Sequence, residues 1–94
     1  MTKLEIIKIL KTYKLSFDIK EFVLFGSYSN GSNHKDSDID IAYILKDNTK
    51  LTFDNYLRLE KKLTDSFKTK IDLMNFKKLN PLIKLDAKDD FIYV

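Results

Sequence analysis

The sequence has no cysteine and a single histidine, His34. Without thiols the chain has no disulfide scaffold and no thiolate metal site, and one imidazole is too few for a histidine zinc site. No apolar run approaches the roughly 20 residues of a membrane span. The N-terminal segment also lacks the apolar core and cleavage site of a signal peptide. We therefore expect a soluble, cytoplasmic protein.

Glycine, with two residues, and proline, with one, are also scarce, and no linker, repeat or low-complexity tract divides the chain. The length of 94 residues allows one small domain, which we place at residues 1–94. Seven phenylalanines and five tyrosines argue against disorder. The net charge of +3 suits a phosphate-bearing ligand as well as nucleic acid, so charge alone does not choose between them.

Hydrophobic periodicity predicts helices and strands in alternation. The helices are expected at residues 3–15, 53–68 and 81–87, each preceded by a capping residue. The strands are expected at residues 21–25, 38–45 and 70–75, and residues 91–94 form a last strand or a tail. The polar segment 27–37 reads as a loop, with room for one helical turn after Gly26.

This order of elements indicates an α/β (α+β) fold, in which helices cover one small mixed sheet. About a dozen residues without a long helix join the first two strands, so we expect these strands to be antiparallel. The predicted buried face of the helix 53–68 consists of Phe53, Tyr56, Leu57, Leu63 and Phe67. The first helix is expected to bury Leu4, Ile6, Ile7, Leu10 and Tyr13.

Two aspartates, Asp38 and Asp40, alternate with Ile39 and Ile41 in the second predicted strand. Because side chains alternate between the faces of a strand, both aspartates point to the same face. Two carboxylates held there repel each other, and burying them destabilises the fold. A cation between them relieves the repulsion, and Mg²⁺, which prefers oxygen ligands, is the natural candidate.

A third aspartate, Asp72, lies between Ile71 and Leu73 in the next predicted strand. If the second and third strands are neighbours, three carboxylates converge. Three anionic ligands suit one or two Mg²⁺ ions that hold a nucleoside triphosphate. We therefore predict catalytic and metal-binding roles for Asp38, Asp40 and Asp72.

Gly26 and Ser27 come where the first predicted strand ends and a turn begins. Glycine lets a phosphate approach the backbone closely. The N–H groups of such a turn, together with the Ser27 hydroxyl, bind phosphate oxygens. We therefore predict that Gly26 and Ser27 bind the nucleotide.

The segment FVLFGSYSNGSNHKDSDIDIAYIL, residues 22–45, resembles the signature of the minimal nucleotidyltransferases, the small branch of the polymerase-β-like superfamily. The family pattern is Gly-Ser, then Asp-x-Asp, then a third carboxylate on a later strand. Here these positions are Gly26, Ser27, Asp38, Asp40 and Asp72. The resemblance continues more loosely to residue 94 and implies the nucleotidyltransferase fold.

The resemblance also implies an activity and a partner. It implies Mg²⁺-dependent nucleotidyl transfer, with two metal ions, of AMP from ATP. Many such small proteins resemble the antitoxin of a pair whose toxin is an all-helical HEPN-type ribonuclease, which they neutralise by adenylylating a tyrosine, by binding, or both. The chain departs from the pattern at Asn30, where family members commonly carry Arg or Lys. Lys35 or another lysine would have to supply that charge.

Three functions remain open. The first is the adenylyltransferase described above. The second is an antitoxin that neutralises its toxin by binding alone; Asn30 and the small size favour it, whereas three clustered carboxylates, which are costly to hold together, favour an enzyme. The third is transfer to RNA or an antibiotic, which usually requires a further substrate-binding domain, and no pattern of stacking aromatics indicates direct nucleic-acid binding.

Overall fold

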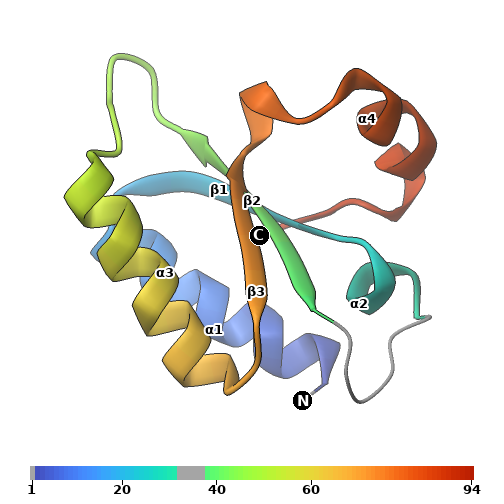
Figure 1. Cartoon of the computed structure of the whole chain (residues 1–94), viewed down its shortest axis with the longest axis horizontal. Coiled ribbons are helices and arrows are strands. Elements are labelled where there is room, and N and C mark those ends of the chain that lie inside the picture. Colours follow the sequence, from blue (N-terminus) through green and yellow to red (C-terminus); the bar gives the residue numbers. More distant parts are fainter. Residues whose placement is uncertain (1, 32–37) are drawn as a thin grey trace.

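The computed structural model describes residues 2–31 and 38–94, and for Ser27 and Asn30 it describes the backbone (Figure 1). His34, Lys35 and the rest of the predicted loop from residue 32 to residue 37 lie outside these described residues. The helices are α1 (Lys3–Ser16), α2 (Ser27–Asn30), α3 (Phe53–Phe67) and α4 (Pro81–Ala87). The strands are β1 (Ile19–Phe25), β2 (Ile39–Leu45), β3 (Ile71–Asn75) and β4 (Ile92–Tyr93).

Local signals in the sequence account for the starts of the helices. A capping box links Thr2 and Glu5 at the start of α1. The side chain of Thr52 accepts a hydrogen bond from the backbone N–H of Asn55 and so caps α3. The side chain of Asn80 accepts a hydrogen bond from the backbone N–H of Leu82 and so caps α4, whose first residue is Pro81. The remaining helical elements are two short 3₁₀ turns, Phe76–Lys78 before α4 and Lys88–Asp90 after it.

The strands form one mixed sheet in the order β3-β2-β1-β4. β1 pairs antiparallel with both β2 and β4, as expected for the short connection between β1 and β2. β2 and β3 are parallel neighbours, and α3 provides the crossover between them. The prediction of a small mixed sheet covered by helices is therefore confirmed.

Helices α1 and α3 cover one face of the sheet, in the lower left of Figure 1. The core beneath them is built from alternate strand residues, including Phe22, Leu24, Ile39 and Ile41, all fully buried. A smaller core on the opposite face contains Val23, Phe25, Ala42 and Leu79. Along β2, even-numbered residues therefore face this second side. No helix in the described residues is long and apolar enough to cross a lipid bilayer.

Three residues predicted to be buried are exposed, which corrects the sequence analysis. Leu4 is 78% exposed, Phe53 73% and Leu57 43%. Leu4 and Phe53 lie in the first turns of α1 and α3, at the edge of the packed region. Leu57 is one residue away from Tyr56, so it is rotated about 100° off the buried stripe. Leu59, which the sequence analysis left out, is fully buried with Leu63 and Phe67.

This correction leads to a stability prediction. Leu59→Ala removes a fully buried side chain and is expected to lower the free energy of unfolding by about 2–5 kcal/mol. Phe53→Ala removes a larger but exposed side chain and is expected to change it by less than about 0.5 kcal/mol. Urea denaturation of both variants checks the ranking. Equal losses would contradict the burial described here.

Candidate active site

The three predicted carboxylates lie at the amino-terminal ends of β2 and β3. Asp40 is opposite Phe25 of β1 on one side and opposite Asp72 of β3 on the other. Because paired residues of parallel strands point to the same face, the side chains of Asp40 and Asp72 are adjacent. Asp38 directly precedes β2 and, by alternation, belongs to the same face. The convergence of the three acids follows from this register.

The charge of Asp40 is strongly affected by its surroundings. Burial, followed by the nearby charges of Asp72 and Asp38, raises the pKa of Asp40 from 3.8 to about 6. Asp40 and Asp38 are half-buried, whereas Asp72 is exposed on the edge strand. A bound cation would favour the ionised form of Asp40, and Asp72 remains reachable from solvent.

Gly26 packs directly against Asp40. Its φ is +76°, a backbone conformation that residues with a side chain rarely adopt. A Cβ atom at this position would also overlap the Oδ2 atom of Asp40. The carboxylate of Asp40 therefore occupies the space that any other residue at position 26 would need. This contact explains in steric terms why a glycine stands between β1 and α2.

Two residues that the sequence analysis missed hold the turn formed by α2. The hydroxyl of Ser29, which is buried, donates a hydrogen bond to the backbone carbonyl of Asp90. The Nζ of Lys3 donates to the backbone carbonyl of Ser29 at 2.9 Å. The Lys3–Ser29 contact joins residues 26 positions apart in the sequence, and the Ser29–Asp90 contact joins residues 61 positions apart. No local pattern in the sequence therefore indicates either contact.

The turn that contains Gly26 and Ser27 is present as one short helical turn, with the backbone N–H of Ser29 bonded to the carbonyl of Gly26 at 3.1 Å. Through its hydrogen bond to Ser29, the ammonium group of Lys3 lies beside the residue that precedes Asn30. The binding of phosphate by Gly26 and Ser27 stays a prediction.

The donor set fits a hard divalent cation, because it consists of carboxylate oxygens that repel one another. Within the described residues, however, no three Asp, Glu, His or Cys side chains gather closely enough to enclose one ion. Mg²⁺ is commonly held by one or two carboxylates, with substrate phosphates and water as the other ligands. The site therefore fits an ion that arrives with a phosphate ligand.

The fold and the arrangement of three acids beside a glycine turn define a nucleotidyltransferase domain. The chain belongs to the family described as polymerase beta, nucleotidyltransferase, whose model matches residues 5–93.

Two similar proteins have names that are more specific than the description of the family. The chain is 36% identical over 85 residues to a Methanocaldococcus jannaschii protein assigned as a protein adenylyltransferase, MJ1379, and the match covers 89% of this chain and 85% of that protein. It is 39% identical over 62 residues to the protein adenylyltransferase MntA of Shewanella oneidensis. That second match covers 64% of this chain and 42% of MntA.

Solved structures share the fold. A toxin–antitoxin structure with AMP-PNP superimposes with a TM-score of 0.66 at 25% identity, covering 96% of this chain and 78% of the other. The complex MntA–HpeT, as a Y104A mutant, superimposes with a TM-score of 0.69 at 26% identity, covering 100% and 72%. The predicted family and fold are therefore confirmed.

The raised pKa of Asp40 predicts how stability depends on pH without metal. An acid whose pKa is higher in the folded state favours folding below its unfolded pKa, and this contribution is lost as the pH rises through the folded pKa. In EDTA, we expect the melting temperature to fall between pH 3.8 and about 6. Asp40→Asn should flatten this fall, as measured by scanning calorimetry, while Asp86→Asn on the exposed side of α4 should leave it in place.

At neutral pH in EDTA, Asp38→Asn/Asp40→Asn should be at least as stable as the unmodified protein, because it removes repulsion between acids. Mg²⁺ should raise the melting temperature of the unmodified protein more than that of this variant. A large loss of stability in EDTA would contradict the electrostatic description of the site.

The two glycines provide a matched pair of substitutions. Gly26 and Gly31 both have positive φ, +76° and +84°, so alanine at either position costs about 1–2 kcal/mol of backbone strain. Only Gly26→Ala also displaces the carboxylate of Asp40, because no described atom lies within 4 Å of a Cβ at Gly31. We expect Gly26→Ala alone to weaken Mg²⁺-dependent ATP binding, by about tenfold or more. Calorimetric titration measures this difference, and equal effects of the two variants would refute it.

Proposed function

We propose that this chain is a Mg²⁺-dependent protein adenylyltransferase that transfers AMP from ATP to a tyrosine hydroxyl of a helical HEPN-type toxin, and so acts as an antitoxin. The observation that carries the proposal is the register of β2 and β3, which sets Asp40 beside Asp72 next to the Gly26 turn. Carboxylates that can hold a metal ion, next to a glycine turn with backbone N–H groups, are parts that nucleotidyl transfer requires.

The donor nucleotide is held by two sets of groups in this proposal. Asp38 and Asp40 would hold Mg²⁺ that arrives with the triphosphate, and Asp72 would be a further carboxylate beside it. The ions would neutralise charge on the phosphates and in the transition state. The turn at Gly26 and Ser27 holds the leaving β- and γ-phosphates. Lys3, through Ser29, fixes this turn against α1.

In the transfer step, the acceptor oxygen attacks the α-phosphorus of ATP. A bond forms between that oxygen and phosphorus, the bond from the α-phosphorus to the bridging oxygen breaks, and pyrophosphate leaves. Asp72 accepts the hydroxyl proton as general base. Its exposure on the edge strand β3 suits this role, because an acceptor from outside the chain can reach it.

The acceptor is assigned to another protein for two reasons. Two cavities of the described residues, one lined by Tyr43 and Lys77 and the other by Phe17 and Arg58, lie away from the three acids, so neither holds an acceptor beside them. Both relatives are assigned as protein adenylyltransferases, and both superimposed structures are toxin–antitoxin assemblies. A protein that docks over Asp72 therefore supplies the hydroxyl.

A second function, neutralisation by binding alone, is favoured by Asn30, which stands where the family commonly has a basic residue. Experiments on this chain together with its toxin distinguish neutralisation by binding from neutralisation by adenylyl transfer. If the chain neutralises its toxin by binding alone, the three acids contribute nothing, and substitutions at Asp40 leave the neutralisation intact. In the enzymatic function, neutralisation depends on Asp40 and on ATP.

The test is to incubate the purified chain and its toxin with Mg²⁺ and ATP, and to weigh the toxin by mass spectrometry. We expect a gain of one or more AMP units on a tyrosine, abolished by Asp40→Asn and by EDTA. Asp86→Asn, which removes an exposed acid of α4 that is not one of the three candidate acids, should leave the gain unchanged.

Co-purification of the toxin with Asp40→Asn separates transfer from docking. Retained binding without any mass gain supports the enzymatic role of Asp40. A toxin that is neutralised by the unmodified chain without a mass gain would overturn the proposed transfer and leave the binding function in its place.

A further inference from the structure

A cavity of about 750 Å³ lies at the opposite end of the sheet from the three acids. It is formed by Tyr43 and Leu45 of β2, the connection from Lys46 to Leu51, and Asn75, Lys77 and Lys78 after β3. Its volume is within the range of small-ligand sites in proteins. The catalytic proposal makes no use of this cavity.

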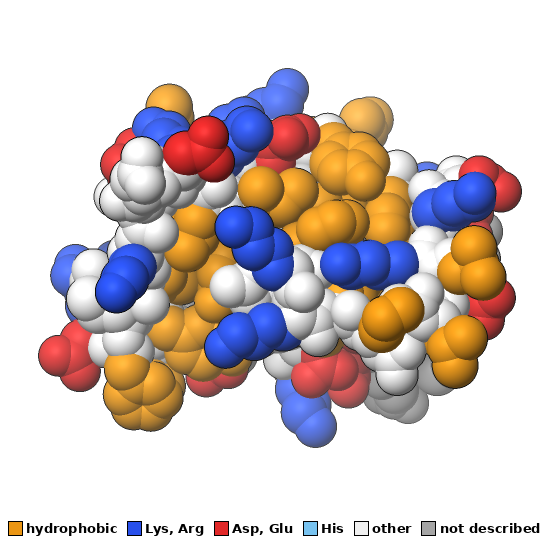
Figure 2. Space-filling model, turned by 90° about the horizontal axis from the view of Figure 1, so that it is seen from above, with side chains coloured by type: hydrophobic (Ala, Val, Ile, Leu, Met, Phe, Trp, Pro, Cys, Tyr) orange, Lys and Arg blue, Asp and Glu red, His pale blue; other side chains and the backbone are white. Residues whose placement is uncertain are grey.

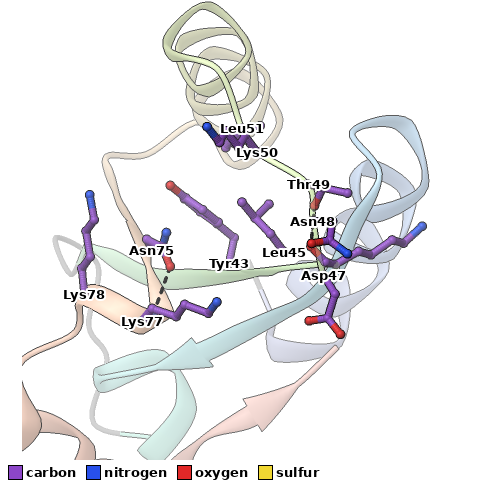
Figure 3. Close-up of a pocket in the computed structure, with 11 residues that line it drawn as sticks. Tyr43, Leu45, Asp47, Asn48, Thr49, Lys50, Leu51, Asn75, Lys77 and Lys78 are labelled. Atoms are coloured by element: carbon purple, nitrogen blue, oxygen red, sulfur yellow. Dashed lines mark hydrogen bonds between the residues drawn. The ribbon is translucent and has the colours of Figure 1, made fainter.

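Positive charge dominates the cavity walls. Four lysines and one acid line it, and Lys46 among these lysines is paired with Asp18. No carboxylate of the described residues lies within ion-pair distance of the other three, Lys50, Lys77 and Lys78. Figure 3 shows their side chains around that of Tyr43. Three ammonium groups that line one cavity give it a positive potential, which favours an anion over a cation there.

The rest of the wall adds to the preference for an anion. Asp47, the one acid, points away from Tyr43 (Figure 3). The N-terminus of α3 begins directly after Leu51 and Thr52, so the positive end of a 15-residue helix adjoins the cavity. Figure 2, which looks onto this end of the molecule, shows Lys and Arg side chains spread between hydrophobic ones.

We propose that this cavity is a second anion site, which binds a small ligand with two adjacent phosphate groups. Lysine ammonium groups bind phosphate as point charges, and three of them match the charge of a diphosphate better than that of a single phosphate. Both a nucleoside diphosphate and inorganic pyrophosphate have this chemistry. The volume suits either of them.

The site is independent of the proposed catalytic site. Tyr43, the cavity residue of β2 nearest to Asp40 in the sequence, is three positions along the strand from it, which is about 10 Å at the usual rise of a strand. A diphosphate is too short to reach both ends. The three acids at the other end need a metal ion to accept phosphate, whereas the lysines do not. Binding in EDTA therefore reports on the lysine cavity, whether or not the chain is an adenylyltransferase.

The experiment is a titration of the ¹⁵N-labelled chain in EDTA with pyrophosphate, ADP and inorganic phosphate, followed by amide NMR shifts. We expect saturable shifts at residues 46–51 and 75–78, with pyrophosphate binding about tenfold more tightly than phosphate. If ADP shifts the same amides, the ligand is a nucleoside diphosphate; if only pyrophosphate does, it is the inorganic ion. Either result supports the site.

Lys77→Ala/Lys78→Ala removes two exposed lysines and is expected to weaken pyrophosphate binding by about tenfold. Lys8→Ala/Lys11→Ala is the matched control, because it removes the same charge from exposed positions of α1 outside the cavity. Equal weakening by both variants, shifts confined to the surroundings of Gly26, or equal affinity for phosphate and pyrophosphate would each overturn the proposal.

Discussion

The parallel pairing of β2 with β3 is the constraint on which the candidate active site depends. It sets Asp40 opposite Asp72, and alternation adds Asp38 on the same face. Without a counter-ion this arrangement is unfavourable, which appears in the pKa of Asp40, raised to about 6 by burial and by its two acidic neighbours. The fold thus holds together carboxylates that would separate in solution, and its packing supplies the free energy for doing so.

The surroundings of Asp40 are arranged to fit this cluster. Gly26 leaves room for the carboxylate because it has no Cβ, and its positive φ starts the short helical turn α2. Ser29 then ties that turn to Asp90, and Lys3 ties it to α1. Three distant parts of the chain therefore determine the position of one turn, which is the kind of support that precise placement of a substrate requires.

The sheet also separates opposite charges at its two ends. The amino-terminal ends of β2 and β3 hold acids, and their carboxyl-terminal ends open into a cavity with Lys50, Lys77 and Lys78. A net charge of +3 for the whole chain conceals this division. Since Coulomb interactions weaken with distance and are screened by salt, the charges at one end have little effect on those at the other.

The sequence by itself determined the local features: the capped starts of the helices, the alternation of β2 and the convergence of three acids once two strands are neighbours. These follow from interactions within a few residues, which a linear pattern contains. Only the tertiary structure decided that Phe53 is exposed, that Lys3 and Ser29 fix the turn, and that lysines from two segments share one cavity. The physical reason is that burial, long-range hydrogen bonds and cavities depend on which elements pack together in space, and local propensity does not specify that packing.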